Sequence, residues 1–498
     1  MSSVPALLII SLSFFIQTIS GIIFYLIIAR TLPVPEVGAI SLFLSFGGIF
    51  TAAFAFNLDT GFAHFISYFR GRTGKFLIPI FFWKITAFIM VATFIIIVLI
   101  SHLIALDFFH QSSYYVIMII LGGYVSESIG ISYIVSILQG IQSFKLAAIS
   151  NIVYSVLSLG IPIYMVFLGL PIEIISTGFV VGAGISLIVS TSFIMSNRLP
   201  KMPEDRKFKS KFFAYVLPVY FGSLTSTLMV TIDRIILPAL SNLSLMAIYT
   251  YSITIASVVG AITSPFSFLL LPKISQAFAS SHRLEARLYS QASLELFYYF
   301  ALPASLGVAI LSRPLLEFLV GGIYASHYIV LQIMVLSYSF FSFRPILSTI
   351  LLGNKKTGTY MYTGIGALGV NVTMSIIMIP LFGIYGAVIA NVSAMGVSTI
   401  PRLVSVNSLL NHSLTLIPFI KIWLNALIMM TLVFYSGKIF SNGAESLFIP
   451  IIIGIITYFF LSIVNRPFSE EAKEIGSLMV KGSHPFIGRV LKILLATS

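Results

Sequence analysis

Cysteine and charged side chains are the two things this 498-residue chain lacks most. The absence of cysteine excludes a disulfide framework, a thiolate nucleophile and a cysteine metal site. Charged residues make up 9% of the chain, against roughly 25% in soluble domains. So few charges could not cover the surface of a soluble protein of this length. Apolar residues reach 58% and the mean hydropathy is +1.05, so we expect lipid to be the main solvent.

The few charges are mostly positive, with a net charge of +13 and a pI near 9.7. In a soluble protein this balance would indicate a nucleic-acid partner. Here the lysines and arginines lie in short loops between apolar runs, which is the pattern of a membrane protein with basic cytoplasmic loops. We therefore expect contact with membrane lipids and no nucleic-acid partner.

Fourteen apolar runs are long enough to cross a bilayer as helices, which takes about 20 residues. None shows the alternation of a membrane β-barrel, so the predicted fold class is all-α, a polytopic membrane protein. The first run has no preceding lysine or arginine and no clean cleavage site, so we expect a retained helix. The runs are 4–29, 37–68, 76–104, 113–138, 145–169, 173–196, 212–239, 244–271, 291–312, 327–352, 359–382, 385–411, 414–436 and 446–465.

The loops between the runs predict the orientation. If the N-terminus is cytoplasmic, most lysines and arginines fall in cytoplasmic loops, including the basic stretch from Arg198 to Lys211 and, by this count, Arg402. Only Arg30, Arg313 and Lys438 fall outside. This asymmetry predicts a multi-pass protein of the cell membrane with both termini in the cytoplasm.

A weak internal repeat suggests how the runs are grouped. Leu168-Gly169 resembles Phe382-Gly383, and the loop after Arg30 resembles the one after Ala239. Both offsets are a little over 200 residues, and an even number of helices per copy predicts two parallel bundles. We expect an N-terminal six-helix bundle, a second six-helix bundle, two extra helices and a cytoplasmic tail. Their predicted bounds are 1–200, 201–411, 412–466 and 467–498.

The sequence offers no catalytic motif. Its seven histidines form no ligand spacing, and Gly364 to Gly369 matches a dinucleotide-binding pattern without the strand that should precede it. We therefore expect no enzyme, no cofactor and no metal. The short outside loops also disfavour a membrane glycosyltransferase or ligase, which usually needs a sizeable acceptor domain.

Ionisable residues inside the runs are the main functional candidates, because charges are costly in lipid. Arg234 ends a polar stripe that begins at Ser223, and Asp233 lies beside it. The stripe predicts that Arg234 lines a wet cavity and binds substrate. The alternative is a structural ion pair between Asp233 and Arg234.

Three further residues lie well inside the runs. Arg344 precedes Pro345, which favours a kinked, cavity-lining position, with snorkelling to the inner surface as the alternative. Glu127 falls mid-membrane and is a candidate for proton or cation coupling, or else is paired or protonated. Asp59 lies late in its run, where a helix break would expose it. We assign Arg344 to substrate binding, and Glu127, Asp59 and Asp233 to ion coupling.

Arg30 and Lys84 lie nearer the membrane interfaces. Both are candidates for substrate binding, and snorkelling toward the interface is the alternative for each.

Four segments together carry a resemblance to a known family. They are Ile28–Gly38, Asp233–Leu237, Leu271–Ser275 and Ile379–Ala390. In order and spacing they resemble the polysaccharide and O-antigen flippases of the multidrug/oligosaccharidyl-lipid/polysaccharide exporter superfamily. The resemblance covers about residues 10–410. It implies a V-shaped pair of bundles around a central cavity and a carrier-diphosphate glycan as substrate.

The sequence therefore predicts a flippase that moves a lipid-linked glycan, an isoprenoid diphosphate bearing sugars, across the membrane by alternating access. Arginine suits the phosphate because its planar fork donates two parallel hydrogen bonds. We expect a monomer, with H⁺ or Na⁺ as a candidate coupling ion. The rival functions are a cation-coupled multidrug or small-molecule exporter of the same superfamily and a scaffold that transports nothing.

Overall fold

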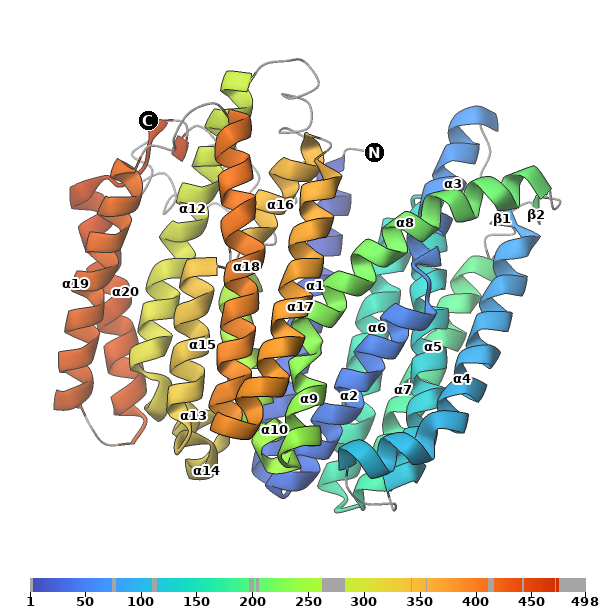
Figure 1. Cartoon of the computed structure of the whole chain (residues 1–498), viewed down its shortest axis with the longest axis horizontal. Helices are drawn as coiled ribbons and strands as arrows, with labels where there is room; N and C mark the ends of the chain where they lie inside the picture. Colours follow the sequence, from blue (N-terminus) through green and yellow to red (C-terminus); the bar gives the residue numbers. More distant parts are fainter. Residues whose placement is uncertain are drawn as a thin grey trace. The chain divides into compact units, whose positions relative to one another are not determined.

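The computed structural model is built from helices (Figure 1). It describes residues 3–73, 78–109, 114–196, 201–202, 206–261, 283–341, 343–354, 356–410, 416–440, 443–470 and 472–473. The Leu271–Ser275 segment and the tail from residue 474 onward lie outside the described residues. The described helices are α1 (Ser3–Thr31), α2 (Val34–Phe54), α3 (Leu58–Thr73), α4 (Ile80–Phe109), α5 (Tyr115–Gly140), α6 (Phe144–Phe167), α7 (Ile172–Ser196), α8 (Arg206–Thr231), α9 (Asp233–Leu240), α10 (Leu243–Ala261), α12 (Arg283–Ile310), α13 (Ser312–Val320), α14 (Gly322–Ala325), α15 (Tyr328–Phe341), α16 (Arg344–Gly353), α17 (Thr357–Phe382), α18 (Ile384–Leu410), α19 (Ile417–Ile439) and α20 (Glu445–Asn465).

The prediction of an all-α membrane protein is confirmed. Twelve segments of the described chain are long and apolar enough to span a bilayer, and two shorter apolar helices, Ile16–Thr31 and Leu243–Val259, fall in two other predicted runs. The described strands are two residues each: β1 (Ile78–Pro79) pairs in parallel with β2 (Lys201–Met202).

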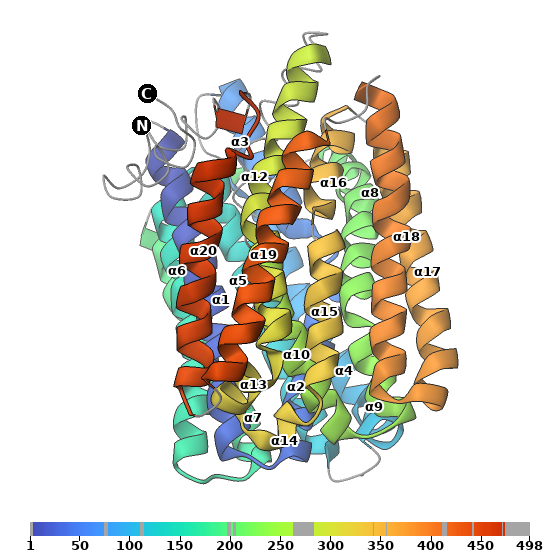
Figure 2. The same cartoon turned by 90° about the vertical axis from the view of Figure 1, so that its left-hand side faces the viewer.

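The chain forms two compact units, Met1–Thr250 and Tyr251–Ser498, here called the first and second units. In the first, α1 packs on α6, α6 on α7, α4 on α5, and α8 on α2. In the second, α17 lies beside α18, and α19 beside α20, as Figures 1 and 2 both show. The division into bundles 1–200 and 201–411 stays a prediction, because it concerns the repeat and not the contacts.

Three of the predicted continuous runs are divided in the structure. Run 37–68 becomes α2 and α3, run 212–239 becomes α8 and α9, and run 327–352 becomes α15 and α16. In each case an ionisable residue lies at or next to the start of the second helix: Asp59, Asp233 and Arg344. The hydropathy pattern passes smoothly through all three breaks. Of the three, the sequence predicted only the one next to Arg344, as a kink at Pro345.

The internal repeat has a counterpart in backbone conformation. Gly169 ends the turn after α6 with φ +67°, and Gly383 ends α17 with φ +56°. A positive φ is strained for residues with a Cβ and easy for glycine. Each glycine leads into a helix that packs along the preceding one. The two turns therefore connect an equivalent pair of packed helices in each unit.

Candidate functional site

Asp59 and Asp233 each stabilise a helix break through hydrogen bonds. Oδ1 of Asp59 accepts the backbone N–H of Thr60 at 2.8 Å, and its Oδ2 accepts the hydroxyl of Ser132 on α5 at 3.1 Å. Carboxylates are favoured at helix N-termini, where backbone N–H groups are unsatisfied and the helix dipole is positive. This local role explains why an acid stands at the break.

Asp233 repeats this arrangement in a fully buried position. Its Oδ1 accepts the backbone N–H of Arg234 at 2.9 Å, and its Oδ2 accepts the hydroxyl of Tyr249 on α10. The side chain is 0% exposed. Two of the three acids assigned to ion coupling, Asp59 and Asp233, therefore have hydrogen-bond donors from the protein itself.

Arg234 differs from its neighbour in sequence. Its side chain is half-buried, and the buried Nε has no hydrogen-bond partner among the described residues. It interacts electrostatically with Tyr25 of α1. Within the part of the chain that the structure describes, no ion pair joins the side chains of Asp233 and Arg234. The guanidinium therefore keeps hydrogen-bonding capacity for a ligand.

Glu127 lies on α5 with one carboxylate oxygen, Oε2, buried and without a hydrogen-bond partner in the described structure. Gly184 of α7 makes room for it, since a Cβ at that position would lie 3.0 Å from Oε1. One residue further along α5, Ser128 starts a chain of hydroxyls, with Tyr154 at 2.9 Å and Tyr124 3.0 Å beyond. The surroundings suit a carboxyl group that gains and loses a proton or a cation.

The second unit holds Arg344 at the first residue of α16, half-buried. Its charge acts electrostatically on that of Arg402 of α18. The hydroxyl of Ser348 links the two residues, since it accepts from Nη1 of Arg402 and donates to the carbonyl oxygen of Arg344. The count of basic loop residues had placed Arg402 in a cytoplasmic loop, and that placement is wrong. Arg402 lies within the candidate span Ile384–Leu409, with 5% of its side chain exposed.

Arg30 and Lys84 are both exposed near helix ends. Arg30 is in the last turn of α1, and Lys84 lies one turn into α4. Exposure at these positions is compatible with snorkelling as well as with substrate binding. The site assignments of both residues stay predictions.

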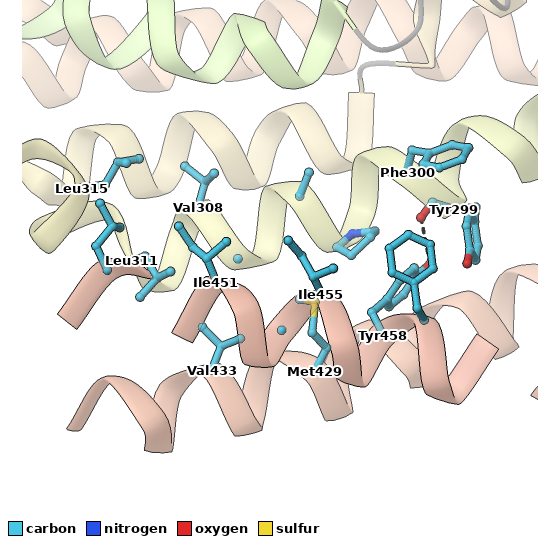
Figure 3. Close-up of a pocket in the computed structure, with 16 residues that line it drawn as sticks. Tyr299, Phe300, Val308, Leu311, Leu315, Met429, Val433, Ile451, Ile455 and Tyr458 are labelled. Carbon is cyan, nitrogen blue, oxygen red and sulfur yellow. Dashed lines mark hydrogen bonds between the residues drawn. The ribbon is translucent and has the colours of Figure 1, made fainter. Parts of the chain in front are cut away.

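An apolar pocket that the sequence did not predict lies inside the second unit (Figure 3). It has a volume of about 370 Å³ and is lined by residues of α12, α19 and α20 with two leucines at the start of α13. Tyr299, Val308, Met429 and Ile455 are among them, and the hydroxyl of Tyr458 donates to the carbonyl oxygen of Tyr299 at 2.8 Å. This volume is within the range of ligand pockets, roughly 300–1,000 Å³.

Comparison with known proteins assigns a family. A family model described as "Polysaccharide biosynthesis protein" matches residues 5–278, more than half of the chain. The chain belongs to the polysaccharide biosynthesis protein family. This confirms the resemblance predicted from the four sequence segments. No curated protein matches this family member closely.

Solved structures establish the fold of this polysaccharide biosynthesis family member. A lipid II flippase MurJ in an inward closed conformation superposes with a TM-score of 0.71 at 18% identity, covering 92% of this chain and 98% of that one. An inward-facing multidrug resistance MATE family transporter of the MOP superfamily has a TM-score of 0.67 at 14% identity, covering 80% of this chain and 96% of the other. Its outward-facing counterpart reaches 0.59 at 15% identity, covering 82% and 97%. The fold is that of a multi-pass membrane transporter.

Proposed function

We propose that the protein is a flippase that moves a lipid-linked glycan, carried on an isoprenoid diphosphate, across the cell membrane. The observation that carries the proposal is Arg234, a half-buried guanidinium on α9, just after the candidate span Lys209–Thr231. Its buried Nε has no partner among the described residues. A cation in this position suits the diphosphate head of such a lipid. The family and the structural likeness to a lipid II flippase support the same substrate class.

The physics of the head group explains the need for arginine. Moving an unpaired ion out of water costs tens of kcal/mol in the idealised limit. Guanidinium groups replace part of the lost hydration, because they stay charged and bind phosphate through two parallel hydrogen bonds. Arg234 and Arg344 are the main candidates for this contact, with Arg30 and Lys84 nearer the membrane surface.

The apolar pocket offers a place for the lipid part of the substrate. Its lining is almost wholly hydrocarbon and aromatic, which suits a stretch of isoprenoid chain while the head group is moved. Gly307 of α12 lines this pocket, and a Cβ built there meets no atom within 4 Å. A larger side chain at this position would therefore fill the pocket without disturbing the packing around it.

Several finer features belong to the same proposal. Both termini face the cytoplasm, two parallel bundles alternate their access, and the protein acts as a monomer that leaves its substrate chemically unchanged. An inside-negative potential drives an anionic head outward with about 2.3 kcal/mol per charge per 100 mV. Coupling to H⁺ or Na⁺ is therefore an addition and not a necessity, and Glu127 suits it better than Asp59 or Asp233.

A cation-coupled multidrug exporter is the second candidate. The observation that favours it is Glu127 beside the hydroxyls of Ser128, Tyr154 and Tyr124, an acidic and aromatic setting that suits an organic cation. Purified protein in liposomes separates the two functions. We expect movement of a fluorescent polyprenyl-diphosphate glycan and no uptake of a fluorescent organic cation, and the reverse result would select the exporter.

The pocket is tested in the same liposomes. Gly307→Leu should slow the movement of a long-chain lipid-linked glycan more than that of a short-chain one. Gly437→Leu is the matched control, because Gly437 lies on α19 in the same unit, outside the pocket, and also has no atom near its missing Cβ. Equal slowing of both substrates by Gly307→Leu would exclude a lipid-chain role for the pocket.

A further inference from the structure

Arg402 is a buried cation whose hydrogen-bond partners are all neutral. Its Nε donates to the hydroxyl of Thr363 at 2.8 Å, and its Nη1 to the hydroxyl of Ser348 at 2.8 Å. Its Nη2 donates to the carbonyl oxygen of Tyr360 at 3.3 Å. These bonds satisfy N–H groups but supply no counterion for the positive charge among the described residues. A buried charge is costly unless it is paired.

The neutral partners hold the guanidinium in one orientation. The hydroxyl of Ser348 donates its proton to the carbonyl oxygen of Arg344 at 2.9 Å, and that of Thr363 donates to the carbonyl oxygen of Thr359 at 2.8 Å. Both hydroxyl oxygens therefore turn lone pairs toward Arg402. The ring of Tyr360 lies 4.8 Å from the guanidinium carbon and adds a cation–π contact. Three helices, α16, α17 and α18, thus fix this one side chain.

A second positive charge lies beside the first. Arg344 is close enough to act electrostatically on Arg402. It is also the first residue of α16, where the helix dipole is positive and disfavours a cation. Two like charges in a medium of low dielectric repel each other strongly. An anion between or beside them would turn this repulsion into attraction.

We infer that Arg344 and Arg402 form an anion-binding site within the second unit that takes a phosphate or carboxylate group of the lipid-linked glycan. The half-buried Arg344 contacts the anion, and the buried Arg402 supplies the second charge and is joined to Arg344 through Ser348. This inference deepens the proposed function and rests on it for the identity of the substrate. Phosphate of the carrier and carboxylate of an acidic sugar share the chemistry that the two arginines recognise, a planar pair of oxygens.

The two sources of the anion are separated by three probes. Thermal stabilisation of the purified full chain in detergent is titrated with a prenyl diphosphate that lacks sugar, with an oligosaccharide that bears uronic acids and lacks phosphate, and with a neutral oligosaccharide of the same length. We expect stabilisation by one of the two anionic probes and none by the neutral one. Stabilisation by the diphosphate assigns the site to the carrier, and stabilisation by the uronate assigns it to the sugar. No response to either anion would overturn the inference.

Variants show whether the response comes from this site. Arg402→Gln should weaken binding of the stabilising anion on the order of tenfold to a hundredfold, because the second positive charge is lost. Arg402→Lys should keep part of the affinity, and Ser348→Ala, which leaves both charges, should weaken it less than Arg402→Gln. Arg313→Gln is the matched control, because Arg313 is exposed on α13 of the same unit.

A merely structural Arg402 would give a different result. Arg402→Gln would then lower the melting temperature without ligand and leave the dissociation constant of the anion unchanged, which would overturn the inference. If Arg402→Gln yields too little folded protein, Arg402→Lys and Ser348→Ala decide by the same comparison of dissociation constants. A wild-type protein that binds the anion but moves no lipid-linked glycan in liposomes would contradict the proposed function and leave the binding site standing.

Discussion

Two acids of the first unit, Asp59 and Asp233, and the buried Arg402 of the second unit are stabilised in opposite ways. Asp59 and Asp233 each accept a backbone N–H and a hydroxyl from another helix, at the start of a helix whose dipole favours them. Arg402 has only neutral acceptors and a second cation, Arg344, nearby. The acids are satisfied by the fold, whereas Arg402 keeps a charge that no acidic side chain among the described residues neutralises.

This difference separates structural from functional charge. A charge whose partners are complete in the protein alone stabilises the fold, and its removal should lower the amount of folded protein. A charge that the protein leaves without a counterion has a reason to be there only if a ligand supplies one. By this criterion Arg234, whose buried Nε has no partner among the described residues, belongs with Arg402 although its neighbour Asp233 does not.

The largest expected effect tests the structural side. Asp233→Ala leaves the buried hydroxyl of Tyr249 and a helix-terminal N–H without their acceptor, which should cost about 2–3 kcal/mol. We expect a clearly lower melting temperature and a low folded yield in detergent. Unchanged yield and melting temperature would show that the acid is not structural and would break the comparison.

A double-mutant cycle identifies the partner of Asp233. The combination of Asp233→Asn with Tyr249→Phe should show a coupling of about 1–2 kcal/mol, because the two side chains are hydrogen-bonded. The combination of Asp233→Asn with Arg234→Gln should show little coupling, since no ion pair joins these side chains in the described structure. Melting temperatures of the single and double variants provide the measurement. Strong coupling of Asp233 to Arg234 would contradict this assignment and support the structural ion pair between the two side chains.

Asp59 offers a weaker version of the same test. Its side chain is only half-buried, so Asp59→Ala and Ser132→Ala should each cost about 1 kcal/mol in stability. The two losses should not add, because both variants remove the same hydrogen bond. Additive losses in melting temperature would mean that the hydrogen bond between Asp59 and Ser132 contributes nothing to stability.

The smallest expected effect concerns Glu127. If its carboxyl group carries a coupling proton or cation, Glu127→Gln should slow the movement of lipid-linked glycan a few-fold and abolish its response to an imposed ion gradient. The membrane potential alone still drives the anionic head, so some activity remains. The rate is measured in liposomes with and without gradients of H⁺ and Na⁺. A variant that responds to the gradients like the wild type would remove Glu127 from coupling.

Much of the fold followed from the sequence because hydropathy reports membrane helices directly. The runs were readable from apolar length, and the repeat of Leu168-Gly169 at Phe382-Gly383 marked two turns whose positive φ only the structure shows. The breaks before Asp59 and Asp233 were not, since each lies inside a run that stays apolar on average. The first break even uses positive φ at Phe56 and Asn57, without a glycine or proline to signal it.

The candidate site was predictable only in part. Arg234, Arg344 and Glu127 stood out as ionisable residues deep inside apolar runs. Arg402 lay inside the run 385–411 as well, but the count of basic residues by loop assigned it to the cytoplasmic side. The pocket could not be foreseen, because its lining comes from two pairs of consecutive helices, α12 with α13 and α19 with α20, that are far apart in the sequence and share no pattern.

The central claim is that Arg234 binds the phosphate of a lipid-linked glycan, and transport by Arg234 variants tests it most directly. Movement of a fluorescent polyprenyl-diphosphate glycan is measured in liposomes that contain equal amounts of folded wild-type, Arg234→Lys or Arg234→Ala protein. Lysine should keep part of the activity because the charge survives, whereas alanine should lose most of it, on the order of tenfold to a hundredfold, because a desolvated phosphate is left unpaired. Normal movement by Arg234→Ala at normal folded yield would contradict the account.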